Sequence, residues 1–174
     1  MTRVLTRMIA ACLAALTPAG SNAAAPEEAA AEAPRLIFLF EETVLLGEST
    51  KAGKTPYGDR NIVPITGGTI TGPYLTGKVR PGGWDWQLAA PGGCFTLKAD
   101  YMIEAADGTI INVLNQGAFC KSQGGPTSRS FTSPRFEAPV GKYGWLNDGA
   151  YVGTLAPATV AGRPAVRIRF YKAG

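Results

Sequence analysis

The stretch that decides the fold spans residues 94–120 and has the sequence CFTLKADYMIEAADGTIINVLNQGAFC. Apolar and polar residues alternate on both sides of Ala106-Asp107-Gly108, with the period of two that is typical of half-buried β-strands. Gly108 suits the left-handed position of a three-residue hairpin loop with a bulge. We therefore predict a β-hairpin whose strands are residues 94–105 and 109–119.

This turn also predicts the hairpin register. If Ala105 pairs with Thr109, the numbers of paired residues sum to 214, and Cys94 lies opposite Cys120. Directly opposed residues that are not hydrogen-bonded to each other bring their Cβ atoms close enough for a disulfide. The pattern therefore predicts a Cys94–Cys120 disulfide. The alternatives are two free buried thiols, or a one-residue slip caused by another bulge.

The same register gives the hairpin one apolar face and one polar face. Its apolar face pairs Phe95 with Phe119, Leu97 with Gly117, Ala99 with Asn115, Tyr101 with Val113 and Ile103 with Ile111. Its polar face carries Lys98, Asp100, Glu104, Asn112 and Gln116. Asn115 is the one amide on the apolar face, so we expect it to point into the interior and to take part in a ligand site.

The period of two continues outside the hairpin. Further β-type runs cover residues 35–46, 62–70, 75–80, 84–90, 130–137, 145–155 and 165–171, and polar loops are expected at 47–61 and 121–129. Short strands with turn signals every ~8–12 residues indicate a sandwich or barrel. We predict an all-β fold, a small closed antiparallel up-and-down β-barrel of about 8–10 strands, since closure removes exposed edges. Such a barrel holds its own side chains or one small ligand.

The N-terminus has the pattern of a secretory signal peptide. Residues 1–24 contain a charged start, a short apolar stretch and small residues at the end. We expect residues 25–34 to be a disordered spacer, residues 35–174 to be the single barrel domain, and the protein to be periplasmic or secreted. The alternatives are an amphipathic first helix of the domain and a lipoprotein box ending at Cys12.

Composition narrows the possible chemistry. The chain has no histidine, which excludes a Ser-His-Asp triad, a His-ligated zinc site and a His general base. Its net charge is +4, with the cations spread along the chain, so no nucleic-acid partner is expected. No segment approaches the ~20 apolar residues of a transmembrane helix, so no stable membrane insertion is expected. We also expect no metal and no cofactor, and the oligomeric state stays open.

Polar and aromatic side chains set into apolar strands or at strand ends are the candidates for ligand contacts. They are Arg60, Asn61, Asp85, Trp86, Tyr101, Asn115, Trp145 and Asn147. Asp85 would bind a hydroxyl or act as a base with a raised pKa if it faced the lumen, or would hold turn amides if it did not. Periodicity does not choose between these. For the others, the alternatives are a solvated arginine, turn asparagines and core aromatic residues.

Several short motifs, in this order, resemble the bacterial domain-of-unknown-function family 3237. They are PITGGT at residues 64–69, GGWDWQ at 82–87, NQG at 115–117, PRFE at 134–137 and YGWLN at 143–147. The resemblance covers roughly residues 35–171 and implies a compact β-barrel, but no settled reaction. The chain departs from the usual family pattern in its export signal and in a polar loop inserted after Phe119.

Two classes of function follow. The first is a barrel that binds a small apolar or aromatic molecule in its lumen. The second is an enzyme that uses Asp85, Tyr101, Arg60 or Asn115 for proton transfer, isomerisation or cyclisation. A structural envelope protein with a filled core is the third alternative.

Overall fold

The computed structural model describes residues 33–120 and 130–174. The predicted signal peptide, nearly all of the predicted spacer and the predicted loop at 121–129 lie outside the described residues. Within the described ranges, no helix is long and apolar enough to cross a membrane.

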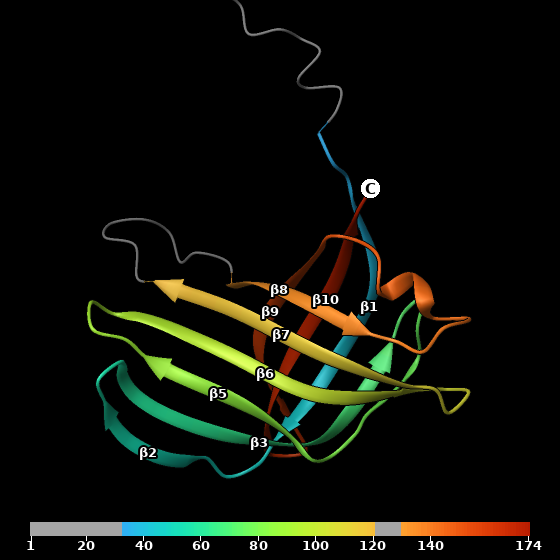
Figure 1. Ribbon diagram of the computed structural model, residues 1–174. Coiled ribbons are helices and arrows are strands. Elements are labelled where there is room, and N and C mark those ends of the chain that lie inside the picture. Colours follow the sequence, from blue (N-terminus) through green and yellow to red (C-terminus); the bar gives the residue numbers. More distant parts are fainter. Residues whose placement is uncertain (1–32, 121–129) are drawn as a thin grey trace, which may run out of the picture. The chain divides into compact units, whose positions relative to one another are not determined.

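Ten strands and one short 3-10 helix make up the described part of the chain (Figure 1). They are β1 (Leu36–Leu46), β2 (Thr50–Thr55), β3 (Gly58–Thr71), β4 (Gly77–Val79), β5 (Gly83–Ala89), β6 (Cys94–Ala105), β7 (Ile110–Cys120), β8 (Ser130–Glu137), η1 (Gly144–Leu146), β9 (Tyr151–Val160) and β10 (Arg163–Ala173).

The strands close into an antiparallel barrel. β1 pairs with β10 on one side and with β3 on the other, which joins the two ends of the sheet. β4 and β5 follow one another in a single position between β3 and β6, while β2 pairs with β3 outside the ring. The ring therefore has eight positions, and the predicted closed up-and-down barrel is confirmed.

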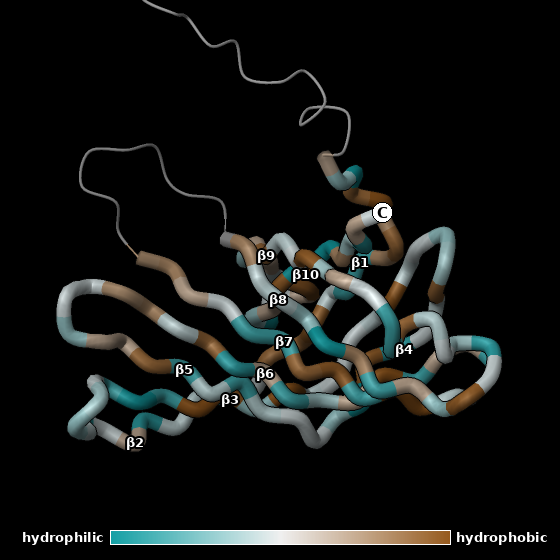
Figure 2. The backbone as a smooth tube through the Cα atoms, turned by 45° about the horizontal axis from the view of Figure 1, so that its top comes forward, coloured by the Kyte–Doolittle hydropathy of each residue, from teal (hydrophilic) through white to brown (hydrophobic). Residues whose placement is uncertain are grey.

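The predicted hairpin register is also confirmed. Ala105 donates its N–H to the Thr109 carbonyl at 2.9 Å, and Gly108 has a φ of 87°. Cys94 pairs with Cys120 in the ladder, and the two are joined by a disulfide. The free-thiol and slipped-register alternatives are therefore wrong. Figure 2 shows the resulting alternation of apolar and polar residues along β6 and β7.

The expected loop at 47–61 is corrected, because it contains β2 and the start of β3. These strands form a hairpin closed at Thr55, whose hydroxyl donates to the Gly58 carbonyl at 2.9 Å. The β2 side chains are almost all exposed. A strand without a buried face needs no apolar alternation, so its polar sequence resembles a loop.

The expected strand at 145–155 is also corrected. Trp145 lies in η1, and β9 begins only at Tyr151. The Asn147 side chain holds the intervening loop to the end of β8: its Oδ1 accepts from the Ala138 N–H at 2.8 Å and its Nδ2 donates to the Ala138 carbonyl at 3.0 Å. A local polar contact of this kind competes with strand formation.

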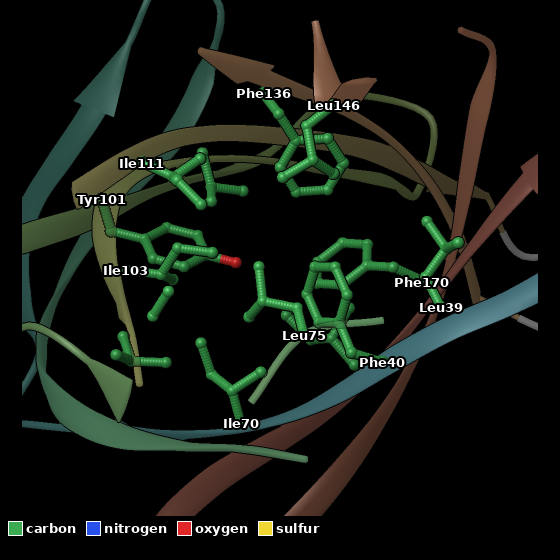
Figure 3. Packing of buried hydrophobic residues seen from close by; sticks show 14 of the residues in the cluster. Leu39, Phe40, Ile70, Leu75, Tyr101, Ile103, Ile111, Phe136, Leu146 and Phe170 are labelled. Atoms are coloured by element: carbon green, nitrogen blue, oxygen red, sulfur yellow. The ribbon is translucent and has the colours of Figure 1, made fainter. Parts of the chain in front are cut away.

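The lumen is packed in one half. Phe40, Phe136 and Phe170 contact one another there, with ring centroids 5.0–6.0 Å apart. Leu75 and Leu146 pack against the same cluster (Figure 3). A cavity remains elsewhere in the lumen.

Candidate functional site

The cavity has a volume of about 190 Å³ and a mostly apolar wall. Its polar lining residues are Asp85, Gln87, Tyr101 and Asn115; its apolar ones are Val44, Leu46, Ile65, Phe95, Leu97, Ala99, Phe119, Leu155, Pro157, Val166 and Ile168. An apolar pocket with a few convergent polar groups is the usual composition of a small-molecule site.

Ala99 lies at the centre of the polar wall. It pairs with Asp85 on β5 and with Asn115 on β7, so these three residues form one row across neighbouring strands. Tyr101 is two residues further along β6, which makes it a diagonal neighbour of both Asp85 and Asn115. The Cα atoms of diagonal neighbours are about 7–8 Å apart. Because Ala99 contributes only a methyl group, the three polar side chains surround a shared space.

Asn115 is fully buried, and both polar atoms of its side chain lack a hydrogen-bond partner among the described residues. Burying an amide without partners costs roughly 1–3 kcal/mol by protein mutational data. The amide presents one donor nitrogen and one acceptor oxygen to the cavity. A hydroxyl or carbonyl group of a ligand would therefore gain a ready partner here.

Asp85 is held by a chain of hydrogen bonds. Gln87 donates from Nε2 to Asp85 Oδ2 at 2.7 Å, and Asn61 donates from Nδ2 to Gln87 Oε1 at 3.1 Å. The second oxygen of Asp85, Oδ1, has no partner among the described residues. Burial raises the pKa of Asp85, and the bond from Gln87 opposes this rise. The result is an oriented carboxyl group with one free oxygen.

A second carboxyl group, that of Glu42, contacts the hydroxyl of Tyr101. Tyr101 donates its phenolic hydrogen to Glu42 Oε2 at 2.6 Å. Glu42 is fully buried on β1 between Ile70 and Ile168 of the neighbouring strands. Burial raises the pKa of Glu42 to about 8, although the bond from Tyr101 opposes the rise. Burial also raises the pKa of Tyr101, and the negative charge of an ionised Glu42 adds to this.

The sequence-based candidates missed Glu42, although the sequence contained a signal for it. Glu41 and Glu42 are adjacent within the apolar run LIFLFEETVLL of β1. Since successive side chains of a strand point to opposite faces, one of two adjacent glutamates has to face inward. Glu41 faces outward and pairs with Arg167 and Arg169, so Glu42 is the inward one.

Three of the eight predicted site residues line the cavity: Asp85, Tyr101 and Asn115. A fourth, Asn61, reaches the site through its bond to Gln87. Asp85 faces the lumen, which answers the question that periodicity left open.

The other four predicted residues lie elsewhere, which corrects the expectation of one shared lumen site. Because Asp85 faces inward, the alternation of β5 turns Trp86 outward, where it is 43% exposed. Trp86 and Arg60 border an open depression of about 780 Å³ on the outside of the barrel, beside Lys98. Trp145 lines a separate hollow with Tyr74, and Asn147 makes the loop contacts described above.

Comparison with known proteins gives a family and a fold. A family model described as "Protein of unknown function (DUF3237)" matches residues 34–173. A UPF0311 protein of Bradyrhizobium diazoefficiens is 37% identical over 131 residues, which are 68% of this chain and 86% of that protein.

The solved structures that are similar to the chain include two bacterial proteins. A conserved protein of unknown function from Rhodopseudomonas palustris has a TM-score of 0.70 at 31% identity, covering 81% of this chain and 98% of that one. A β-barrel-like protein from Acinetobacter baumannii has a TM-score of 0.72 at 27% identity, and the match covers 81% of this chain and 96% of that one.

Proposed function

Because the chain belongs to the DUF3237 family, whose function is unknown, we propose a role from the site alone: the lumen binds a small, mainly apolar molecule that carries a hydroxyl or carbonyl group. The observation that carries this proposal is the buried amide of Asn115, whose two polar atoms find no partner within residues 33–120 and 130–174. A barrel interior that served only as a core would be more stable with an apolar residue at this position. The site therefore favours a ligand over a filled structural core.

The size of the cavity limits the ligand. An apolar cavity of about 150 Å³ is enough to bind benzene, and this one has about 190 Å³. The part of the ligand that fits into the cavity is therefore about the size of one six-membered ring with a small substituent. Its polar group would lie against Asn115 and Asp85, and its ring against the apolar wall.

Replacing Asn115 by leucine tests this role. Leucine has a similar volume but no polar atoms, so Asn115→Leu should weaken phenol binding at least ~10-fold, the loss of about one hydrogen bond, while toluene binding stays near that of the wild type. The variant should be as stable as the wild type, or more stable by about 1–3 kcal/mol. Calorimetric titration with both compounds and urea unfolding measure these effects.

The control is Gln116→Leu, because Gln116 is the exposed neighbour on the outer face of β7. It should leave phenol binding unchanged. If Asn115→Leu binds phenol as well as the wild type does, or if it unfolds, Asn115 is not a ligand contact and the proposal fails.

We also propose that the protein is exported and that the barrel works in an oxidising compartment. The supporting observations are the signal-peptide pattern of residues 1–24 and the Cys94–Cys120 disulfide, since disulfides persist mainly in such compartments. Protein recovered from the periplasm should begin near Ala24 or Ala25.

The same material should show no reactive thiol when it is denatured without reduction. Replacing both disulfide cysteines by alanine should lower the free energy of unfolding by about 3 kcal/mol. Mass analysis that finds an intact Met1, or thiol labelling that finds two free cysteines in the mature chain, would refute export or the bridge respectively.

A further inference from the structure

Building on the lumen binding proposed above, we infer that the site also catalyses proton transfer at carbon. Asp85 removes a proton from the carbon next to the carbonyl group of a small apolar ketone. Tyr101, which is positioned by its hydrogen bond with Glu42, donates a hydrogen bond to the carbonyl oxygen.

The placement of Asp85 and Tyr101 suits this reaction. Both line the same cavity, on diagonal positions of the neighbouring strands β5 and β6. Ala99 separates them and leaves the space between them open. A ketone placed over Ala99 would have its carbonyl oxygen toward one side chain and its adjacent carbon toward the other. Asn115, on the far side of Ala99, is a second donor for the oxygen.

Asp85 has the properties of a general base. Its Oδ1 has no partner in the described part of the chain, while the hydrogen bonds from Asn61 through Gln87 fix its Oδ2. The apolar wall disfavours the charged form and raises the pKa of Asp85, which makes its carboxylate a stronger base than one in water.

Tyr101 and Glu42 have the properties of an oxyanion partner. Their oxygens are 2.6 Å apart, and Glu42 is neutral at pH 7 because burial raises its pKa to about 8. Tyr101 donates to Glu42 Oε2 in the structure. When a ketone binds, a neutral Glu42 can reverse this bond and donate its own hydrogen to Tyr101 Oη, which frees the phenolic hydrogen to point to the ligand. A tyrosine and a neutral carboxylic acid in an apolar site, opposite an aspartate base, are a proven combination for enolisation.

The proton balance needs no other reactant. The proton passes from the carbon to Asp85 Oδ1, the C–H electron pair becomes the C=C bond of the enolate, and the carbonyl π pair moves onto the oxygen that Tyr101 contacts. Asp85 then returns the proton. Return to the same carbon gives hydrogen exchange, and return to the far end of a conjugated system moves a double bond. Asp85 and Tyr101 are therefore the catalytic residues, and Glu42 is a positioning residue.

Two probes of one ring size test this activity in the purified barrel with its disulfide intact. Isomerisation of 3-cyclohexen-1-one to the conjugated enone is followed by ultraviolet absorbance, and exchange of the α-hydrogens of cyclohexanone in D₂O by NMR. The wild type should accelerate both. Asp85→Asn should lose at least ~100-fold and Tyr101→Phe at least ~10-fold, in line with general base and oxyanion contributions. Asp100→Asn, an exposed outer-face control on β6, should change nothing.

A binding readout separates chemistry from folding. Asp85→Asn removes a negative charge from the cavity, so it should bind 4-nitrophenolate more tightly than the wild type, whereas Tyr101→Phe should bind it more weakly. Either variant would lose 4-nitrophenolate binding altogether if it were misfolded.

The pH profile tests the positioning role of Glu42. Tyr101 from β6 is the titratable group in contact with Glu42, Asp85 lies beyond it, and the partners Ile70 and Ile168 carry no charge. An ionised Glu42 can only accept a hydrogen bond from the Tyr101 hydroxyl, which then no longer donates to the ligand. Wild-type activity should therefore fall above about pH 8. Glu42→Gln should keep its activity there, because a glutamine amide can still donate to Tyr101.

The outcomes are distinct. Wild-type protein that binds cyclohexanone but catalyses neither reaction overturns this inference and leaves lumen binding intact. Absence of both binding and catalysis overturns both proposals. Catalysis that survives Asp85→Asn refutes the assignment of Asp85 as the base.

Discussion

Between pH 5 and pH 9, the ionisation of the Glu42 carboxyl group alone should lower the free energy of unfolding by about 4 kcal/mol. Burial raises the pKa of Glu42 to about 8, from an ordinary value of 4.5, and each unit of difference corresponds to about 1.4 kcal/mol. Between these two values the unfolded chain has lost the proton and the folded chain still holds it. The folded state therefore binds more protons, and stability falls as the pH rises.

The variant Glu42→Gln isolates this effect, because glutamine stays neutral at every pH. Its stability should match that of the wild type near pH 5 and exceed it by about 4 kcal/mol at pH 9. Urea unfolding at a series of pH values measures the difference. Glu41→Gln is the matched control: Glu41 is the outward neighbour, paired with Arg167 and Arg169. If the wild-type and Glu42→Gln curves run parallel across this range, Glu42 is not a buried neutral acid.

A second large effect is expected at Gly83, where Gly83→Ala should cost about 3 kcal/mol or more. A Cβ at this position would lie 2.3 Å from the Cβ of Tyr101 and 2.8 Å from the Asp100 carbonyl oxygen. Neither the tyrosine Cβ nor the backbone oxygen can move away without shifting β6. The variant should therefore both destabilise the barrel and displace Tyr101 from the cavity.

Urea unfolding and the intrinsic fluorescence of the barrel would report these two effects of Gly83→Ala. The control is Gly144→Ala, since the nearest atom to a Cβ there is 3.9 Å away, and this variant should stay near wild-type stability. Unchanged stability in Gly83→Ala would show that β5 and β6 are not packed as closely as the structure has them.

The fold was predictable where local rules were sufficient. The turn at Gly108 and the two-residue period of residues 94–120 predicted the hairpin register, the disulfide and the inward direction of Asn115. Residues 47–61 resembled a loop because β2 is exposed and has no apolar face. Trp145 resembled a strand residue, but the polar contact of Asn147 with Ala138 holds that segment as a loop.

The site was only partly predictable, for a physical reason. A strand such as Trp84-Asp85-Trp86 fits either orientation, and the aromatic residues argued for the wrong one, since large apolar side chains usually lie inside. Here the carboxyl group faces inward, and Trp84 and Trp86 are 45% and 43% exposed. Only closure of the ring decides which face is the lumen. The pairing of Glu42 with Tyr101 depends on that closure too, because β1 and β6 are far apart in the sequence.

The most direct test of the lumen site is the side-chain amide signal of Asn115 in a ¹⁵N NMR spectrum during titration with phenol. This amide is fully buried and unpaired among the described residues, so its two proton resonances report a new hydrogen bond at once. We expect them to shift in a saturable manner, while the exposed amide of Gln116 stays unchanged. If the chemical shifts of the Asn115 amide do not change at phenol concentrations that saturate the protein, this result would contradict a lumen ligand site.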